Sequence, residues 1–150
     1  MATVETPAII VETIAIDAPM TAVFAALTEP DQLVQWWGSA ESYRTTTMEC
    51  DLRPGGAWKT TGIDRDGEAF SVSGTYRIVD APQLIEFTWT HDWSKRGDAN
   101  ETIVRYALTE RDGTTHLTVT HAGFATVEDR DVHAHGWKTV LGWVRAFVTR

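Results

Sequence analysis

Cysteine is almost absent from this sequence, which has Cys50 as its single thiol among 150 residues. One cysteine cannot form an intrachain disulfide, and it cannot supply a cysteine-rich zinc site. A domain of this size can bury roughly 70% of its unfolded surface, so it does not need such cross-links. Because the lack of disulfides is typical of a reducing compartment, we expect the protein to be cytoplasmic.

Long apolar runs and clusters of basic residues are also missing. No stretch approaches the roughly 20 apolar residues of a membrane-spanning helix, and "MATVETPAIIVETIAI" at the start lacks the features of a secretory leader. The formal net charge is -8, and no basic run is longer than "KR". Because phosphate binding depends on clustered Lys and Arg, we expect no nucleic-acid partner. Because no stretch is long and apolar enough to span a bilayer, we expect no membrane partner either.

The sequence contains none of the short motifs that carry catalysis. It has no Gly-x-Ser-x-Gly, no phosphate-binding glycine loop and no obvious group to activate Cys50, which lies in the alternating stretch "MECDL". We expect Cys50 to be a small buried residue. No two histidines have the i, i+4 spacing of a metal site. We therefore assign no catalytic residue, no metal and no cofactor.

Tryptophan, by contrast, is abundant, with seven residues between positions 36 and 143. Its large apolar body and single N–H suit both a core and the wall of a ligand pocket. Hydrophobic residues make up 43% of the chain and charged residues 23%, which is typical of a globular protein. Because no repeat or linker divides the chain, we expect one domain over residues 1–150, with its core at about 9–148.

Hydrophobic periodicity predicts the order of the elements. The stretch "IIVETIAI" at 9–16 predicts a strand, and "DAPMTAVFAALT" and the segment that ends at Gly38 predict two short helices. Turn signals between about 44 and 122 separate alternating runs, which predicts about six antiparallel strands, with the polar segment 92–101 as an exposed loop. Thr126 begins a capping box, and apolar spacings of three and four predict a long final helix.

This order of elements indicates an α+β helix-grip fold. In that fold a curved antiparallel sheet of about six or seven strands wraps around the C-terminal helix, and two short helices follow the first strand. With Val132, His133, Trp143 and Phe147 included, the apolar arc of the last helix spans about half of its circumference. A stripe that wide can cover the concave face of a sheet and leave a cavity beside it.

Alternation along the strands assigns side chains to the inner face. The inward set in the strand around 70–78 is Phe70, Val72, Gly74, Tyr76 and Ile78. The next strand contributes Ile85, Phe87, Trp89 and His91. His121 and His133 also face inward, although a histidine in such a position is more often a packed residue than a ligand. A metal would require His91, His121 and His133 to converge.

Trp36 and Trp37 are adjacent and are followed by Gly38. Neighbouring helical residues point about 100° apart, so both indoles cannot lie at the centre of one buried stripe. We expect one indole to anchor its helix and the other to form a wall at the cavity entrance.

Five segments, taken in order, resemble a known family. They are "ALTEPDQLVQWWG", "LRPGGAW", "GTYRIVDAPQLIEFTW", "THLTVTHAGF" and "HAHGWKTVLGWV". In order and spacing they resemble the branch of the START and birch-pollen-allergen-like (SRPBCC) superfamily that is similar to the activator of heat-shock-protein-90 ATPase, over about residues 9–148. The resemblance implies a helix-grip fold with a hydrophobic cavity, in a superfamily whose members bind lipids, polyketides or hormones. The segments 121–124 and 133–137 match motifs characteristic of the family.

The residues and the resemblance together predict that a small hydrophobic molecule, aromatic, polyketide-like or lipid-like, binds between the sheet and the last helix. The residues expected to line this cavity are Trp37, Phe70, Tyr76, Phe87, Trp89, His91, His121, His133, Trp137 and Leu141. One alternative is a cyclase or hydrolase that uses an inward histidine as general base. Another is a protein-interaction module like the chaperone activators, with a role in stress response. The oligomeric state stays open, with a homodimer as one alternative.

Overall fold

The structure is a computed structural model that describes residues 9–91 and 101–150. Over these residues the chain forms strand β1 (Ile9–Ile16), helices α1 (Met20–Thr28) and α2 (Pro30–Trp36), six further strands and helix α3 (Val127–Val148). The six strands are β2 (Arg44–Cys50), β3 (Ala57–Ile63), β4 (Ala69–Asp80), β5 (Leu84–His91), β6 (Thr102–Arg111) and β7 (Thr114–Ala122). The predicted order of elements is confirmed. The loop expected at 92–101 lies, apart from Glu101, outside the described residues.

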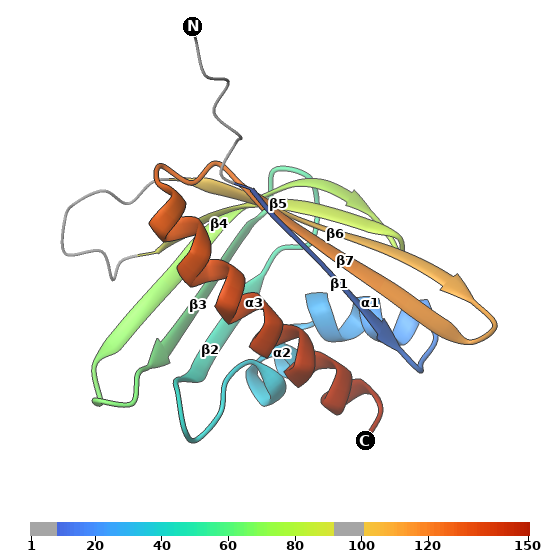
Figure 1. The fold of residues 1–150 in the computed structure, drawn as a ribbon, viewed down its shortest axis with the longest axis horizontal. Coiled ribbons are helices and arrows are strands. Elements are labelled where there is room, and N and C mark those ends of the chain that lie inside the picture. The colour runs from blue at the N-terminus through green and yellow to red at the C-terminus, as the bar shows by residue number, and fades with distance from the viewer. Residues whose placement is uncertain (1–8, 92–100) are drawn as a thin grey trace, which may run out of the picture.

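The strands form one antiparallel sheet in the order β1-β7-β6-β5-β4-β3-β2. Strand β1 pairs with β7, so the first and last strands of the chain lie side by side. Figure 1 shows that the sheet is curved and that α3 crosses its concave side, with α1 and α2 near one end. Helix α3 packs against β1 and α1. The α+β helix-grip fold predicted from the sequence is therefore confirmed.

Helix α3 begins at the predicted capping box. The hydroxyl oxygen of Thr126 accepts a hydrogen bond of 3.1 Å from the backbone N–H of Asp129, which satisfies one of the free donors of the first turn. The buried residues of this helix are Trp137, Val140, Leu141 and Val144, spaced by three and four. None of the described helices is long and apolar enough to cross a membrane.

The two adjacent tryptophans take different environments, as predicted. Trp36 is 4% exposed, and its indole N–H donates to the carbonyl oxygen of Ala26 over 2.8 Å, which ties α2 to α1. Trp37 follows the helix and is partly buried. Gly38 has φ +124°, and a Cβ at this position would overlap the carbonyl oxygen of Tyr43. The turn after α2 therefore requires glycine.

Strand β4 differs from the predicted alternation at its end. The pairing of β4 with β5 shifts by one residue between Tyr76 and Ile78. Since side chains alternate across a strand, one extra residue moves the following side chains to the opposite face. Val79 consequently packs against the hydrophobic core, and the prediction that Ile78 does so was wrong.

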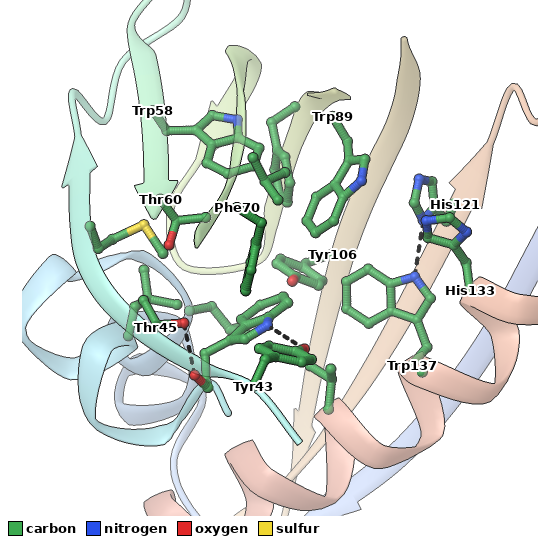
Figure 2. Close-up of a pocket in the computed structure, with 18 of the residues that line it drawn as sticks. Tyr43, Thr45, Trp58, Thr60, Phe70, Trp89, Tyr106, His121, His133 and Trp137 are labelled. Carbon is green, nitrogen blue, oxygen red and sulfur yellow. Dashed lines mark hydrogen bonds between the residues drawn. The ribbon is translucent and has the colours of Figure 1, made fainter. Parts of the chain in front are cut away.

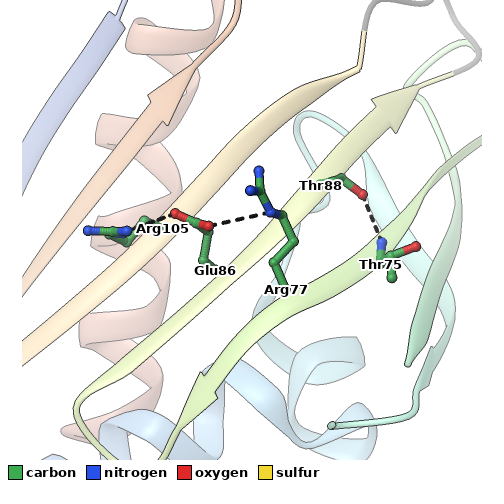
Figure 3. A network of polar contacts seen from close by, with 5 residues as sticks. All are labelled: Thr75, Arg77, Glu86, Thr88 and Arg105. Carbon is green, nitrogen blue, oxygen red and sulfur yellow. Dashed lines mark hydrogen bonds and ion pairs between the residues drawn. The ribbon is translucent and has the colours of Figure 1, made fainter. Parts of the chain in front are cut away.

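The outer face of the sheet carries a polar ladder across three strands. Figure 3 shows Glu86 on β5 between Arg77 of β4 and Arg105 of β6. One carboxylate oxygen of Glu86 accepts hydrogen bonds of 3.0 and 3.1 Å from Arg105, and the other lies 3.6 Å from Nε of Arg77. Both arginines are about half exposed, so solvent screens these ion pairs and they add little stability.

Candidate functional site

A cavity of about 390 Å³ lies on the inner side of the sheet. It is bounded by residues of α1, α2 and α3 and by side chains from strands β2 to β7. Most of the described lining is aromatic or aliphatic, and it includes the four tryptophans Trp37, Trp58, Trp89 and Trp137. Figure 2 shows Trp137 extending from α3 toward the rings contributed by the sheet. The size is within the usual range for small-molecule sites.

The structure brings most of the predicted cavity residues together. Those in the lining are Trp37, Phe70, Tyr76, Phe87, Trp89, His121, His133 and Trp137. Leu141 is instead 4% exposed within the hydrophobic core, outside the lining. His91 is also outside the lining, and its ring centroid lies 5.8 Å from that of His133. Val132 lines the cavity yet is 71% exposed, so it lies at the rim of the apolar arc rather than in the core.

Three aromatic residues of the lining were missing from the predicted set. Trp58 on β3 and Tyr106 on β6 both follow the alternation of their strands, so the period of two contained this information. Tyr43 lies in the irregular connection between α2 and β2, where no period assigns a face. Its ring makes edge contacts with Phe70 of β4 and Trp143 of α3, at centroid distances of 5.6 and 5.7 Å.

His121 is fully buried, and both of its ring nitrogens make hydrogen bonds. The indole N–H of Trp137 donates to Nδ1 over 3.0 Å. Because an indole can only donate, Nδ1 is the unprotonated nitrogen and the proton of the neutral ring is on Nε2. That proton is directed at Oγ1 of Thr102, 2.7 Å away, and the Thr102 hydroxyl donates in turn to the carbonyl oxygen of Trp89 over 3.3 Å. The contacts form one consistent chain of donors and acceptors.

The surroundings of His121 also keep the ring uncharged. The pKa of His121 is lowered from 6.5 to about 3, mainly by burial and in addition by repulsion from the nearby His133 and His91. A general base needs a pKa near the working pH and a free lone pair within reach of the substrate. The lone pair of His121 is already used by Trp137. This geometry does not favour the alternative of a general base at His121.

The three inward histidines do gather at one end of the cavity. The ring centroid of His133 lies 5.5 Å from that of His121 and 5.8 Å from that of His91, and the ring of Phe124 packs against both His121 and His133. Nδ1 of His133 is 2.9 Å from the carbonyl oxygen of Asp129. In the described part of the chain, no group of three or more His, Cys, Asp or Glu side chains has the arrangement of a metal site.

The cavity wall is electrically neutral over most of its area. The pKa of Tyr43 is raised to about 12, because the effect of burial outweighs that of the hydrogen bond from Trp37. Burial also raises the pKa of Tyr76, of Tyr106 and of the Cys50 thiol. All these groups are therefore uncharged at neutral pH, and the wall is suited to an uncharged, apolar molecule.

A curved sheet that holds a cavity against a long C-terminal helix defines the class of helix-grip proteins. Residues 17–147 match the profile of the family described as "Activator of Hsp90 ATPase homolog 1-like protein". Because this match spans most of the chain, the protein belongs to that family. No curated protein matches the chain significantly.

Solved structures show the same fold at low sequence identity. Protein CV1439 from Chromobacterium violaceum has a TM-score of 0.82 and 23% identity, over 97% of this chain and 99% of that one. The AHSA1-like protein from Aeromonas hydrophila has a TM-score of 0.71 and 24% identity, over 93% and 92%. DynU16, a protein in the dynemicin biosynthetic locus, has a TM-score of 0.76 and 18% identity, over 96% of this chain and 48% of DynU16.

Proposed function

We propose that this protein binds a small, uncharged, apolar molecule, aromatic or polyketide-like, in the cavity between the sheet and α3. The observation that carries the proposal is a space of about 390 Å³ walled by four tryptophans and further aromatic rings. A wall of this kind removes apolar ligand surface from water, which contributes a favourable binding free energy of about 25 cal/mol per Å² buried. The polar groups of such a wall orient the ligand rather than supply most of the affinity.

Hydrogen bonds within the protein support a binding role over a catalytic one. The polar groups of Trp37, Trp58, Thr60 and Trp137 are each used by a protein partner. Such groups are held in place and do not have to be stripped of water when a ligand enters. The location of the structurally similar DynU16 in a biosynthetic locus is compatible with a ligand of the polyketide type.

Native mass spectrometry of freshly purified protein, followed by titration with the neutral dye N-phenyl-1-naphthylamine, tests the proposal. We expect a retained small molecule or, for the empty protein, saturable dye fluorescence at a stoichiometry of about one. The same titration in urea-unfolded protein serves as the control and gives no saturation. Absence of both a retained mass and saturable dye binding would mean that the side chains close this space in solution, and would contradict the proposal.

A further inference from the structure

Of the four indole N–H groups in the cavity wall, three donate a hydrogen bond within the protein and one does not. Trp37 donates to the hydroxyl of Tyr43 over 2.9 Å, Trp58 to the carbonyl oxygen of Thr88 over 3.1 Å, and Trp137 to Nδ1 of His121 over 3.0 Å. The N–H of Trp89 finds no acceptor among the described residues. Buried donors are nearly always paired in folded proteins, so this group is an exception that needs a reason.

The free donor of Trp89 lies at the histidine end of the cavity. The indole ring of Trp89 lines the cavity, and its centroid is 5.9 Å from that of His121. Figure 2 shows the indole nitrogen on the edge of the ring that faces His121 and His133. Less than 1 Å² of this nitrogen is exposed, so bulk water does not hydrate it.

The ring nitrogens of His121 cannot accept this proton. Nδ1 of His121 already accepts from Trp137, and Nε2 carries the ring proton. Protonation of His121 would not free an acceptor either, because an imidazolium only donates. Because no group of the described residues accepts this proton, it can be satisfied by an acceptor that enters the cavity from outside.

We propose that the ligand carries a neutral hydrogen-bond acceptor, such as a ketone or quinone oxygen, that pairs with the indole N–H of Trp89. The inference rests on the proposed function, because it specifies the ligand of the same cavity. The edge of the indole that carries the N–H is turned toward His121 and His133 (Figure 2), so the acceptor pairs with it at the histidine end of the cavity, where a neighbouring side chain has to shift because less than 1 Å² of the nitrogen is exposed. An apolar body then fills the aromatic part of the cavity, with its one polar end at the histidines.

The charged groups of the cavity wall favour a ligand with a neutral acceptor over an anionic ligand. Among the described lining residues there is no Lys or Arg, and Asp64 contributes a carboxyl group. A carboxylate ligand would lose its hydration without gaining an ion pair with Lys or Arg there, whereas a ketone loses much less on leaving water. The chemical class that fits is an uncharged polycyclic ketone or quinone.

Displacement of N-phenyl-1-naphthylamine by three probes that share one tricyclic ring system tests this inference: fluorene, 9-fluorenone and 9-fluorenecarboxylate. In wild-type protein, 9-fluorenone is expected to bind more tightly than 9-fluorenecarboxylate. Trp89→Phe keeps an aromatic ring but removes the N–H, so it is expected to weaken 9-fluorenone about tenfold and to change fluorene less than twofold. Dividing the change in affinity for 9-fluorenone by the change in affinity for fluorene removes the contribution of the probes' different hydrophobicity.

Trp58→Phe is the matched control, because the N–H of Trp58 is used by Thr88 within the protein. It is expected to change fluorene and 9-fluorenone by the same factor. A second readout needs no variant: in wild-type protein with ¹⁵N-labelled tryptophan, 9-fluorenone shifts the indole proton of Trp89 downfield and fluorene does not. This measurement remains decisive if Trp89→Phe does not fold.

The outcomes separate this inference from the proposed function. Equal effects of Trp89→Phe on fluorene and 9-fluorenone, or an unshifted indole proton, would overturn the role of Trp89 and leave the binding function intact. Tighter binding of 9-fluorenecarboxylate than of 9-fluorenone would overturn the inference that the ligand is uncharged. If the protein binds the dye but none of the three probes displaces it, the inference that the ligand is a polycyclic ketone or quinone is overturned. A protein that binds neither dye nor probe would contradict the proposed function itself.

Discussion

Trp137 of α3 donates a hydrogen bond of 3.0 Å to Nδ1 of His121 on β7, which joins the last helix to the sheet. The two residues come from two of the segments that resemble the family, 121–124 and 133–137. The contact gives both motifs a structural role, because it fixes the tautomer of His121 and the orientation of the Trp137 ring in the cavity wall. Loss of either partner leaves a buried polar group unpaired.

The buried His121 makes folding stability depend on pH. The unfolded histidine binds a proton near pH 6.5, whereas the folded one does so only near pH 3. Its contribution to stability is therefore complete above about pH 6.5 and is lost as the pH falls toward 3, by an amount on the order of a few kcal/mol. Urea unfolding at a series of pH values between 7.5 and 4 measures this loss.

The variant His121→Asn isolates the contribution of this one residue. The side-chain oxygen of asparagine can still accept from Trp137, but the side chain does not titrate. We expect the stability of wild type to fall more steeply with decreasing pH than that of His121→Asn over this window. Parallel pH profiles for the two proteins would show that His121 is not held neutral by the fold.

The three tyrosines of the chain are predicted to ionise at a higher pH in the folded protein than in the unfolded protein. Burial raises the pKa of Tyr43 to about 12 and also raises the pKa of Tyr76 and Tyr106. The folded state keeps its protons above pH 10 while unfolded tyrosines lose theirs, so stability falls as the pH rises beyond 10. Absorbance at 295 nm should show little tyrosinate at pH 10.5 in folded protein and clear ionisation in urea. Equal titration in both would contradict the burial of these hydroxyls.

Gly74 is predicted to be essential for the pairing of β4 with β5. A Cβ there would overlap the carbonyl oxygen of Thr88 and lie 2.7 Å from the indole nitrogen of Trp58, which donates to that same oxygen. We expect Gly74→Ala to lower the free energy of unfolding by at least about 2 kcal/mol, measured with urea. Gly142→Ala is the control, because its Cβ meets nothing within 4 Å and alanine favours a helix by about 1 kcal/mol. Similar effects of the two substitutions would refute the steric argument.

The order of elements could be predicted from the sequence because each one is specified locally. A period of two in the strands, spacings of three and four in α3, and the capping box at Thr126 depend only on neighbours along the chain. The same rules placed Phe70, Phe87 and Trp89 on the inner face, where the structure has them.

Features that depend on distant contacts were not predictable in this way. The shift in register that packs Val79, instead of Ile78, against the core arises in the pairing of two strands, and no residue of β4 alone signals it. Tyr43 reaches the cavity from a connection without periodicity. The saturation of both nitrogens of His121 requires β6, β7 and α3 to be in place together.

Cys50 lines the cavity, so the rate at which its thiol is alkylated can be used to detect a bound molecule. Because burial raises the pKa of its thiol, the reactive thiolate is scarce at neutral pH. We expect iodoacetamide to label Cys50 at pH 7.5 more slowly in folded protein than in urea, and more slowly still with saturating N-phenyl-1-naphthylamine. A labelling rate that the dye leaves unchanged would place the bound dye away from this wall.

Dye binding to two leucine variants of α3 tests the central claim most directly. Gly136 lines the cavity and Gly142 does not, and a Cβ at either position meets nothing within 4 Å. Both substitutions improve helix propensity, so both proteins are expected to fold. Gly136→Leu fills part of the cavity and should weaken N-phenyl-1-naphthylamine at least about tenfold, whereas Gly142→Leu should bind it like wild type. Equal binding by wild type and both variants would contradict a ligand site between the sheet and α3.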